Sequence, residues 1–135
     1  MIYRMYKKDF NYRYNKGKEA ENLVLPIIRD YFKRDIVATT QKTDRYDYTC
    51  SNYKYELKAR NNVMDKYPTT MIGYDKLEEN VILLFKFTDN KIAYIEYNEE
   101  QFKNYKVELF TKYTVPKKHI YIPIEDLTVI DGCDC

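Results

Sequence analysis

The stretch YDYTCSNYKYELKAR, residues 46–60, contains two short runs in which apolar or tyrosine residues alternate with polar ones. The pair Ser51-Asn52 between the runs favours a turn, so the stretch predicts a β-hairpin with a two-residue loop. In that register Asp47 lies opposite Glu56. Because side chains alternate between the faces of a strand, each face carries its own set of residues. The face expected to belong to the core carries Tyr46, Tyr48, Cys50, Tyr53, Tyr55, Leu57 and Ala59, and the other carries Arg45, Asp47, Thr49, Lys54, Glu56, Lys58 and Arg60.

Two carboxylates that face each other across a hairpin are unfavourable. Their side chains would lie roughly 5 Å apart, and like charges in that position destabilise the pair. A positive group should therefore lie between Asp47 and Glu56. The flanking Lys54, Lys58 and Arg45 can supply it, in which case this face is the solvated side of an antiparallel sheet. A divalent cation is the alternative, because Mg²⁺ is commonly held by one or two carboxylates together with waters and phosphate oxygens.

The sequence before the hairpin predicts a helix from Gly17 onward. Apolar residues recur there at three- and four-residue steps, which indicates one buried stripe. The stripe consists of Ala20, Leu23, Val24, Ile27, Ile28, Tyr31 and Phe32. Pro26 lies inside this pattern and removes one hydrogen bond, so we expect a kink near residues 22–25.

Residues 1–15 are expected to form a basic, tyrosine-rich arm. From residue 1 to residue 34 the chain carries nine Lys or Arg and four Asp or Glu, although the net charge of the whole chain is only +2. Basic residues that alternate with tyrosines suit a phosphate backbone and base stacking. The alternative is an arm whose tyrosines pack on the core.

The remaining segments predict a mixed sheet. Strands are expected at IVATTQ (36–41), RYDYTC (45–50), YKYELKA (53–59), NVILLFKF (80–87) and KIAYIEYN (91–98), with a tight turn at residues 88–90. A helical stretch is expected at MIGYDKLEE (71–79), and the C-terminal third adds a short helix and edge strands. The order α-β-β-β-α-β-β indicates an α/β (α+β) fold with a mixed central sheet flanked by helices.

Length and composition indicate one intracellular domain. A chain of 135 residues is long enough for one core and too short for two. No window approaches 18 consecutive apolar residues and no signal-peptide core is present, so we expect no membrane association and a cytoplasmic or nuclear location. The odd set Cys50, Cys133 and Cys135, even with His119, matches no zinc-ligand spacing. We therefore expect reduced thiols and a tail at residues 131–135.

The spacing of Asp47 and the ELK tripeptide (56–58) resembles the PD-(D/E)XK nuclease superfamily. This superfamily shares the restriction-endonuclease-like fold and includes restriction enzymes, Holliday-junction resolvases and viral or phage nucleases. Tyr46 stands where the family often has proline. The segment KGKEAE (16–21) is similar to the KG-x-x-x-E that opens a helix in archaeal-type junction resolvases. The resemblance covers residues 16–98.

The resemblance implies a Mg²⁺-dependent deoxyribonuclease, with Mn²⁺ as a substitute ion. Asp47 and Glu56 are the implied metal ligands, with the Leu57 backbone carbonyl and Glu21 as further ones. Lys58 would activate water or stabilise the transition state, and we expect charge stabilisation because a lysine with an ordinary pKa near 10.4 is a cation. The expected catalytic set is Glu21, Asp47, Glu56 and Lys58. Glu21 has an alternative role as a first-turn acid that complements the helix dipole.

The expected substrate is DNA, cut internally, and a branched DNA would require a homodimer with two paired sites. Candidate contacts to the DNA are Arg45, Arg60, Lys42, Lys66, Lys76 and Tyr74. Two other interpretations remain open. The first is a catalytically inactive nuclease-like fold that binds nucleic acid or protein, and the second is an unrelated α/β domain with a charged hairpin. An active enzyme requires Asp47, Glu56 and Lys58 to converge, whereas the unrelated domain would leave Glu21 away from Asp47.

Overall fold

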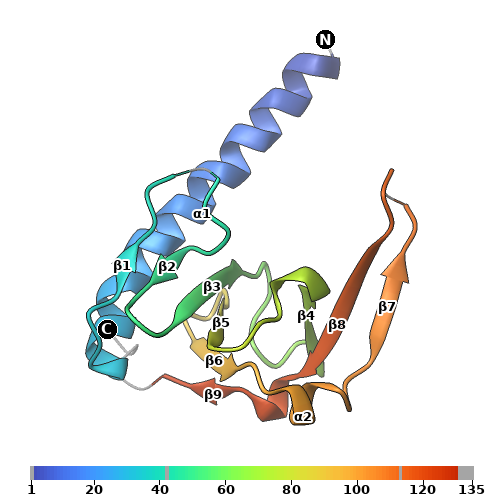
Figure 1. Ribbon diagram of the computed structural model, residues 1–135. Coiled ribbons are helices and arrows are strands. Elements are labelled where there is room, and N and C mark those ends of the chain that lie inside the picture. The colour runs from blue at the N-terminus through green and yellow to red at the C-terminus, as the bar shows by residue number, and fades with distance from the viewer. Residues whose placement is uncertain (1, 42, 113, 131–135) are drawn as a thin grey trace.

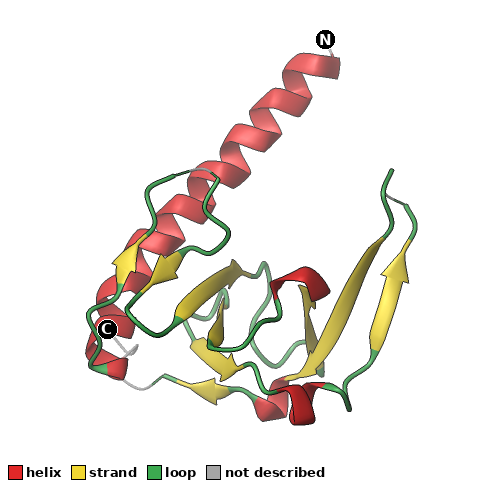
Figure 2. Ribbon diagram, viewed as in Figure 1, coloured by secondary structure: helices red, strands yellow, loops and turns green. Residues whose placement is uncertain are grey.

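The computed structural model describes residues 2–41, 43–112 and 114–130, with side chains from residue 15 onward. Lys42 and the tail at residues 131–135, with Cys133 and Cys135, lie outside the described residues. The described chain is a mixed α and β protein with a mixed sheet and few helices (Figure 1, Figure 2). The sequence-based expectation of the α/β (α+β) class is therefore confirmed at this level.

Helix α1 (Ile2–Phe32) is longer than the sequence predicts. It begins well before Gly17, so the expected arm forms the first half of the helix and extends away from the sheets (Figure 1). The helix also passes through Pro26 without a break. Val24 and Ile28 are fully buried against the sheet, and their burial offsets the hydrogen bond that the proline removes.

The larger sheet has six strands in the order β1-β2-β3-β5-β6-β9. Its two central strands run parallel to each other, and every other neighbouring pair is antiparallel. Strand β5 has five consecutive buried residues because both faces of the sheet are covered there. The strands are β1 (Val37–Ala38), β2 (Tyr48–Thr49), β3 (Lys54–Ala59), β5 (Val81–Lys86), β6 (Ile92–Glu96) and β9 (Thr128–Val129).

A second sheet of three strands has the order β4-β8-β7, with β4 at Thr69–Gly73, β7 at Val107–Phe110 and β8 at Lys117–Pro123. The prediction of a helix at residues 71–79 is wrong. This segment is instead the end of β4 followed by one 3₁₀ turn, η1 (Tyr74–Lys76). Burial alternates along β4, which is the period of a strand, and the pairing with the distant β8 decides its conformation.

Two hydrophobic clusters lie on the two faces of the larger sheet. The cluster under α1 contains Val24, Ile28, Ile36, Tyr48, Tyr55, Leu57, Ile82, Leu84, Ile92 and Ile130. The cluster between the two sheets contains Tyr46, Met64, Ile72, Val81, Leu83, Phe85, Phe87, Ala93, Ile95, Phe102, Ile120, Ile122 and Leu127. A helix therefore covers one face, and a second sheet covers the other. The sequence predicts a central sheet flanked by helices, whereas the structure has α1 on one face and the three-stranded sheet on the other.

The C-terminal third contains the expected short helix and edge strands. Helix α2 (Glu99–Phe102) is capped by Asn98, whose side chain accepts a hydrogen bond from Gln101 N at 2.9 Å. A second 3₁₀ turn, η2 (Ile124–Asp126), leads into β9. Of the helices in the described part of the chain, none combines the length and the apolar character needed to cross a membrane.

Candidate functional site

The hairpin of β2 and β3 has the predicted register at its turn. Thr49 pairs with Lys54 and Tyr48 with Tyr55, as expected. Beyond Tyr48 the register shifts, because Asp47 N also donates to Tyr55 O at 3.0 Å. Two consecutive residues of one strand thus face one residue of the other, as in a β-bulge. The expectation that Asp47 lies directly opposite Glu56 is therefore wrong.

The bulge also moves Tyr46 to the other face of the sheet. Tyr46 packs in the cluster between the two sheets, whereas Tyr48 packs under α1. The predicted face shared by both tyrosines is therefore corrected. The Tyr46 hydroxyl lies 3.2 Å from Lys76 O and 3.1 Å from a carboxylate oxygen of Glu78, so it connects the hairpin to η1 and the segment after it.

The side chain of Asp47 bonds to the backbone of β3 just beyond the last paired residues of β2 and β3. Its Oδ2 accepts a hydrogen bond from Leu57 N at 2.8 Å. Lys54 and Arg60, at even positions, donate their N–H groups toward β5. Leu57 is at an odd position, so its N–H and its carbonyl point to the other edge of β3, the edge next to β2. The Asp47 carboxylate and the Leu57 carbonyl consequently lie at the same edge of β3.

Glu56 is the buried acid of the site. Only 5% of the residue is exposed, and Lys76 Nζ lies 3.1 Å from its Oε2. This contact is an ion pair without hydrogen-bond geometry, because Oε2 has no hydrogen-bond partner among the described residues. Burial and then the charge of Asp47 raise the pKa of Glu56 to about 7, while Lys76 and Lys58 act in the opposite direction.

Glu21 joins the same group of acids from α1. Burial, and then a hydrogen bond with Asp47 and its charge, raise the pKa of Glu21, and Lys18 lowers it from 3.1 Å away. The Tyr48 hydroxyl donates to the backbone oxygen of Glu21 at 2.6 Å and fixes this part of the helix on the hairpin. Glu21 and Asp47 are thus adjacent, which the interpretation as an unrelated domain does not predict.

Lys58 borders a groove next to these acids. The groove has a volume of about 510 Å³. Its lining consists of Lys58, Gly73, Tyr74, Asp75, Lys76, Pro116, Lys117, Lys118 and His119. Lys76 both lines the groove and contacts Glu56, so the groove lies beside the buried acid. Four ammonium groups and one carboxylate line it, which favours a negatively charged ligand.

Two of the predicted DNA contacts are used inside the protein. The Arg60 guanidinium donates to Thr70 Oγ1 at 3.1 Å and to Met71 O, so it links β3 to β4. Burial lowers the pKa of Arg60. Lys76 donates to Arg45 O at 2.6 Å in addition to its contact with Glu56. Arg60 and Lys76 therefore have structural partners.

The other predicted contacts lie on the surface. Arg45 is exposed and donates to Asp75 O and, at 3.3 Å, to the Tyr46 hydroxyl. Tyr74 is 47% exposed and lines the groove. Lys66 is exposed in the loop after β3, 5.5 Å from the centre of the Tyr67 ring.

Sequence reasoning missed the contribution of β8 to the groove. Lys117, Lys118 and His119 follow the hairpin by about sixty residues, and only the pairing of β8 with β4 brings them to Lys58. Lys118 Nζ lies 5.9 Å from the centre of the Tyr74 ring. The adjacent lysines of the PKKH segment (116–119) were the one available signal in the sequence.

The oxygen atoms of the site fit a hard cation in part. Among the described residues, no group of three or more Asp, Glu, His or Cys side chains is arranged so that it could hold a metal ion by itself. Mg²⁺ does not require such a group, because it keeps several waters and often takes only one or two carboxylates. The unsatisfied Glu56 Oε2, the Asp47 carboxylate and the Leu57 carbonyl are suitable donors.

Comparison with protein-family models gives no match, and no curated protein or solved structure matches the chain significantly.

Proposed function

We propose that this protein is a metal-dependent deoxyribonuclease of the PD-(D/E)XK type. One observation carries the proposal: the buried carboxylate of Glu56 shares a site with Asp47, which itself contacts Glu21, beside a lysine-lined groove. Acids from a helix, a bulged strand and a central strand meet where a solvated charged face would keep them apart. This arrangement supports the nuclease interpretation over that of an unrelated domain with a charged hairpin.

We also propose that α1 and the strands β2, β3, β5 and β6 form a restriction-endonuclease-like core. The parallel pair β3 and β5, with antiparallel neighbours on both sides, supports this assignment. So does α1, which packs on one face of these strands and carries Glu21. The three-stranded sheet on the opposite face would then be an addition to the proposed restriction-endonuclease-like core.

The proposed metal ligands are Asp47, Glu56 and the Leu57 carbonyl, with Glu21 behind Asp47. When bound, Mg²⁺ lowers the pKa of water and offsets the charge that develops on a reacting phosphate. The chain's own contribution is to hold two carboxylates together, which costs free energy without a cation and favours cation binding. A bound cation would replace Lys76 as the partner of the buried Glu56 Oε2.

The lysines next to the acids would act on the phosphate. Lys58 lies on the strand of Glu56, two residues on, and faces the groove. Its ammonium group would offset the charge that grows on the phosphate oxygens during hydrolysis. Lys76 would leave Glu56 when a cation binds and would then be available to the substrate.

A nicking assay on supercoiled plasmid tests the proposal. The parent protein should nick the plasmid with Mg²⁺ or Mn²⁺ and lose this activity in EDTA. The Glu56→Gln variant should be inactive, and the Glu79→Gln variant, which removes an exposed acid elsewhere, should retain the activity. Activity that persists in EDTA or in Glu56→Gln would contradict the proposal.

The ion pair between Lys76 and Glu56 favours a second candidate, a nuclease-like fold that only binds nucleic acid. The Lys76 ammonium already neutralises the buried acid at 3.1 Å, so the acids could be stable without a metal. Calorimetric titration with Mn²⁺ separates the candidates. Binding that disappears in Asp47→Asn and in Glu56→Gln supports the enzyme, and a parent protein without Mn²⁺ binding supports the binding component.

A further inference from the structure

The groove has two walls with different chemistry. One wall is η1 with the end of β4, which presents Tyr74 and Lys76, and the other is the start of β8, which presents Lys117 and Lys118. Asp75 is the one acid in the lining. A ligand between these walls would therefore be surrounded by more positive than negative side chains.

Tyr74 offers an aromatic surface inside this positive groove. The residue is 47% exposed, so its ring is accessible to a ligand in the groove. Gly73 precedes it, and a Cβ at that position would lie only 2.7 Å from Asp75 Oδ1. Only the end of the flexible Asp75 side chain would have to shift, so the turn itself does not require glycine. The turn places Tyr74 at the groove, and Lys118 Nζ lies 5.9 Å from the centre of its ring.

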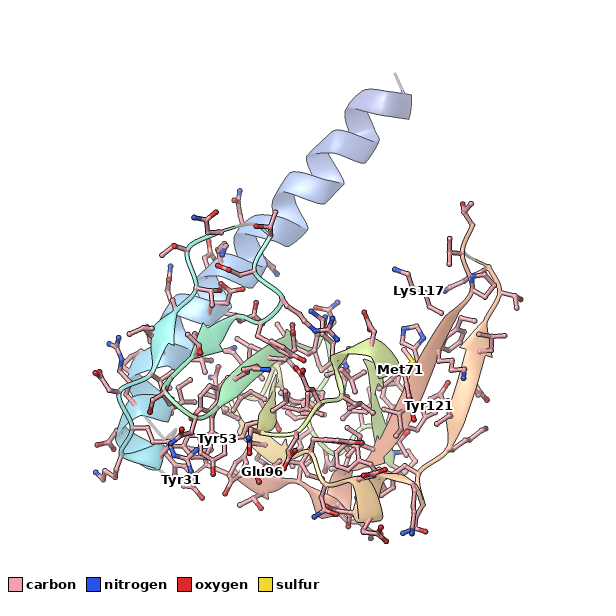
Figure 3. The ribbon with its side chains drawn as sticks, in the orientation of Figure 1. Tyr31, Tyr53, Met71, Glu96, Lys117 and Tyr121 are labelled. Carbon is pink, nitrogen blue, oxygen red and sulfur yellow. The ribbon has the colours of Figure 1, made fainter. Side chains whose placement is uncertain are left out.

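The hairpin of β7 and β8 carries the second wall away from the core. It projects from the sheets on the side opposite α1 (Figure 1), and Figure 3 shows Lys117 beside β8, on the side that faces the rest of the molecule. From Lys106 to His119 the sequence has four lysines and a single acid, Glu108. The projecting hairpin is thus positively charged, although the net charge of the whole chain is only +2.

We propose that this groove binds one unpaired DNA strand, with a base stacked on Tyr74 and phosphates held by Lys117 and Lys118. The proposal rests on the proposed function, because it takes the groove as the approach to the same acids. A positive groove with an aromatic platform is the usual arrangement for single-stranded nucleic acid. A volume of about 510 Å³ suits a segment of one strand, since pockets of roughly 300–1,000 Å³ hold small ligands.

The size of the groove also argues against a duplex inside it. The major groove of B-DNA alone is about 12 Å wide, so a double helix would have to rest on the rims of a space this small. An unpaired strand, such as a flap, an end or a branch point, can enter and place its backbone beside Lys58 and Lys76. The proposal therefore predicts a preference for substrates that contain single-stranded DNA.

Fluorescence anisotropy in EDTA tests the proposal, because binding is then measured without cleavage. The probes are a labelled single-stranded DNA of twelve nucleotides and a blunt DNA hairpin with twelve base pairs, each titrated over a series of NaCl concentrations. The parent protein should bind the single strand at least tenfold more tightly. Tyr74→Ala should weaken this binding by about tenfold or more without changing its salt dependence, and Tyr74→Phe should bind like the parent.

The lysines are tested by the slope of the salt dependence. Lys118→Gln should reduce the slope of log K against log salt by about 0.7, the value for one phosphate contact of a single strand. Lys106→Gln is the matched control, since it removes the same charge from the same hairpin outside the groove, where Lys106 pairs with Glu108 at 2.9 Å. It should leave the slope unchanged.

Two results would overturn the proposal: duplex binding as tight as single-strand binding, or a Tyr74→Ala protein that binds the single strand like the parent. Neither result bears on metal-dependent nicking, so the proposed function could stand. Conversely, the protein could bind single-stranded DNA with the expected salt dependence and yet show no metal-dependent nicking. That result would contradict the proposed function and leave this inference intact.

Discussion

The carboxylate of Asp47 is hydrogen-bonded to the backbone of Leu57, with 2.8 Å between Oδ2 and the amide nitrogen. The pairing of β2 and β3 does not extend to Leu57, so the Asp47 side chain takes the place of a backbone acceptor for the Leu57 N–H. The hydrogen bond also holds the charge of Asp47 close to Glu56, and burial and then this charge raise the pKa of Glu56. One side chain therefore has both a structural role and a proposed role in metal binding.

These two roles of Asp47 can be separated by substitution. Asp47→Asn keeps an oxygen that can accept from Leu57 N, so we expect nearly unchanged stability and a loss of Mn²⁺ binding and nicking. Asp47→Ala leaves the half-buried amide unsatisfied and should destabilise the protein by about 1–3 kcal/mol. Urea unfolding checks the stability. Equal stability of the two variants would show that the hydrogen bond contributes little.

The hairpin could be predicted from the sequence because its signals are local. Alternation of side chains and the turn at Ser51-Asn52 define the pairing of Tyr48 with Tyr55. The bulge could not be predicted in this way. It depends on Thr39, whose hydroxyl donates to Tyr46 O at 2.8 Å and whose N–H donates to Asp47 O at 3.0 Å. These hydrogen bonds come from the segment before the hairpin, so no pattern inside the hairpin indicates them.

The second sheet was missed for a related reason. The segment after residue 70 contains DKLEE, a good helical composition, but the pairing of β4 with β8 across some fifty residues makes it a strand and a turn. The same pairing brings Lys117 and Lys118 to the groove. The acids, Lys58 and Lys76 could be named from the sequence, whereas the placement of Lys117 and Lys118 depends on pairing between distant parts of the chain.

The stability of the metal-free protein should depend on pH through Glu56. Its folded pKa is about 7, above the ordinary value of 4.5, so the unfolded chain loses this proton first and folding stability falls as pH rises from 4.5 to 7. Glu56→Gln removes the charge. Relative to the parent, the variant should be about equally stable at pH 4 and more stable by about 1–3 kcal/mol at pH 8.

Urea unfolding in EDTA at both pH values measures this difference. The comparison of variant with parent cancels the titration of other groups that the substitution does not affect. A stability gain of the same size at pH 4 and at pH 8 would show that Glu56 titrates normally in the folded protein. Added Mn²⁺ should stabilise the parent more than the variant at pH 8, because the cation binds the ionised carboxylate.

The first half of α1 should contribute to DNA binding. Residues 1–15 carry Arg4, Lys7, Lys8 and Arg13 against a single acid, and the structure continues this segment as helix away from the sheets. Deletion of these residues should reduce the slope of log K against log salt for duplex DNA, by about 0.9 for each phosphate that the segment neutralises. The fold should survive, because Val24 and Ile28, the fully buried residues of α1 among the described side chains, lie beyond the deleted segment. Circular dichroism and salt titrations check both expectations, and an unchanged slope would exclude a role of this segment in DNA binding.

Lys58 provides the sharpest test of the proposed chemistry. If its ammonium group stabilises charge in the transition state, Lys58→Ala should lower the cleavage rate by a factor on the order of 10² to 10³, while the acids still bind Mn²⁺. Lys54→Ala is the matched control, because Lys54 lies on the same strand and the same face but pairs with Glu78 at 2.9 Å. If Lys58 only neutralises the acids, its loss should destabilise the hairpin, and the remaining activity should follow the folded fraction. Calorimetry with Mn²⁺, a cleavage time course and urea unfolding distinguish these outcomes. A folded Lys58→Ala protein that cleaves DNA at the parent rate would contradict the proposed role of this lysine.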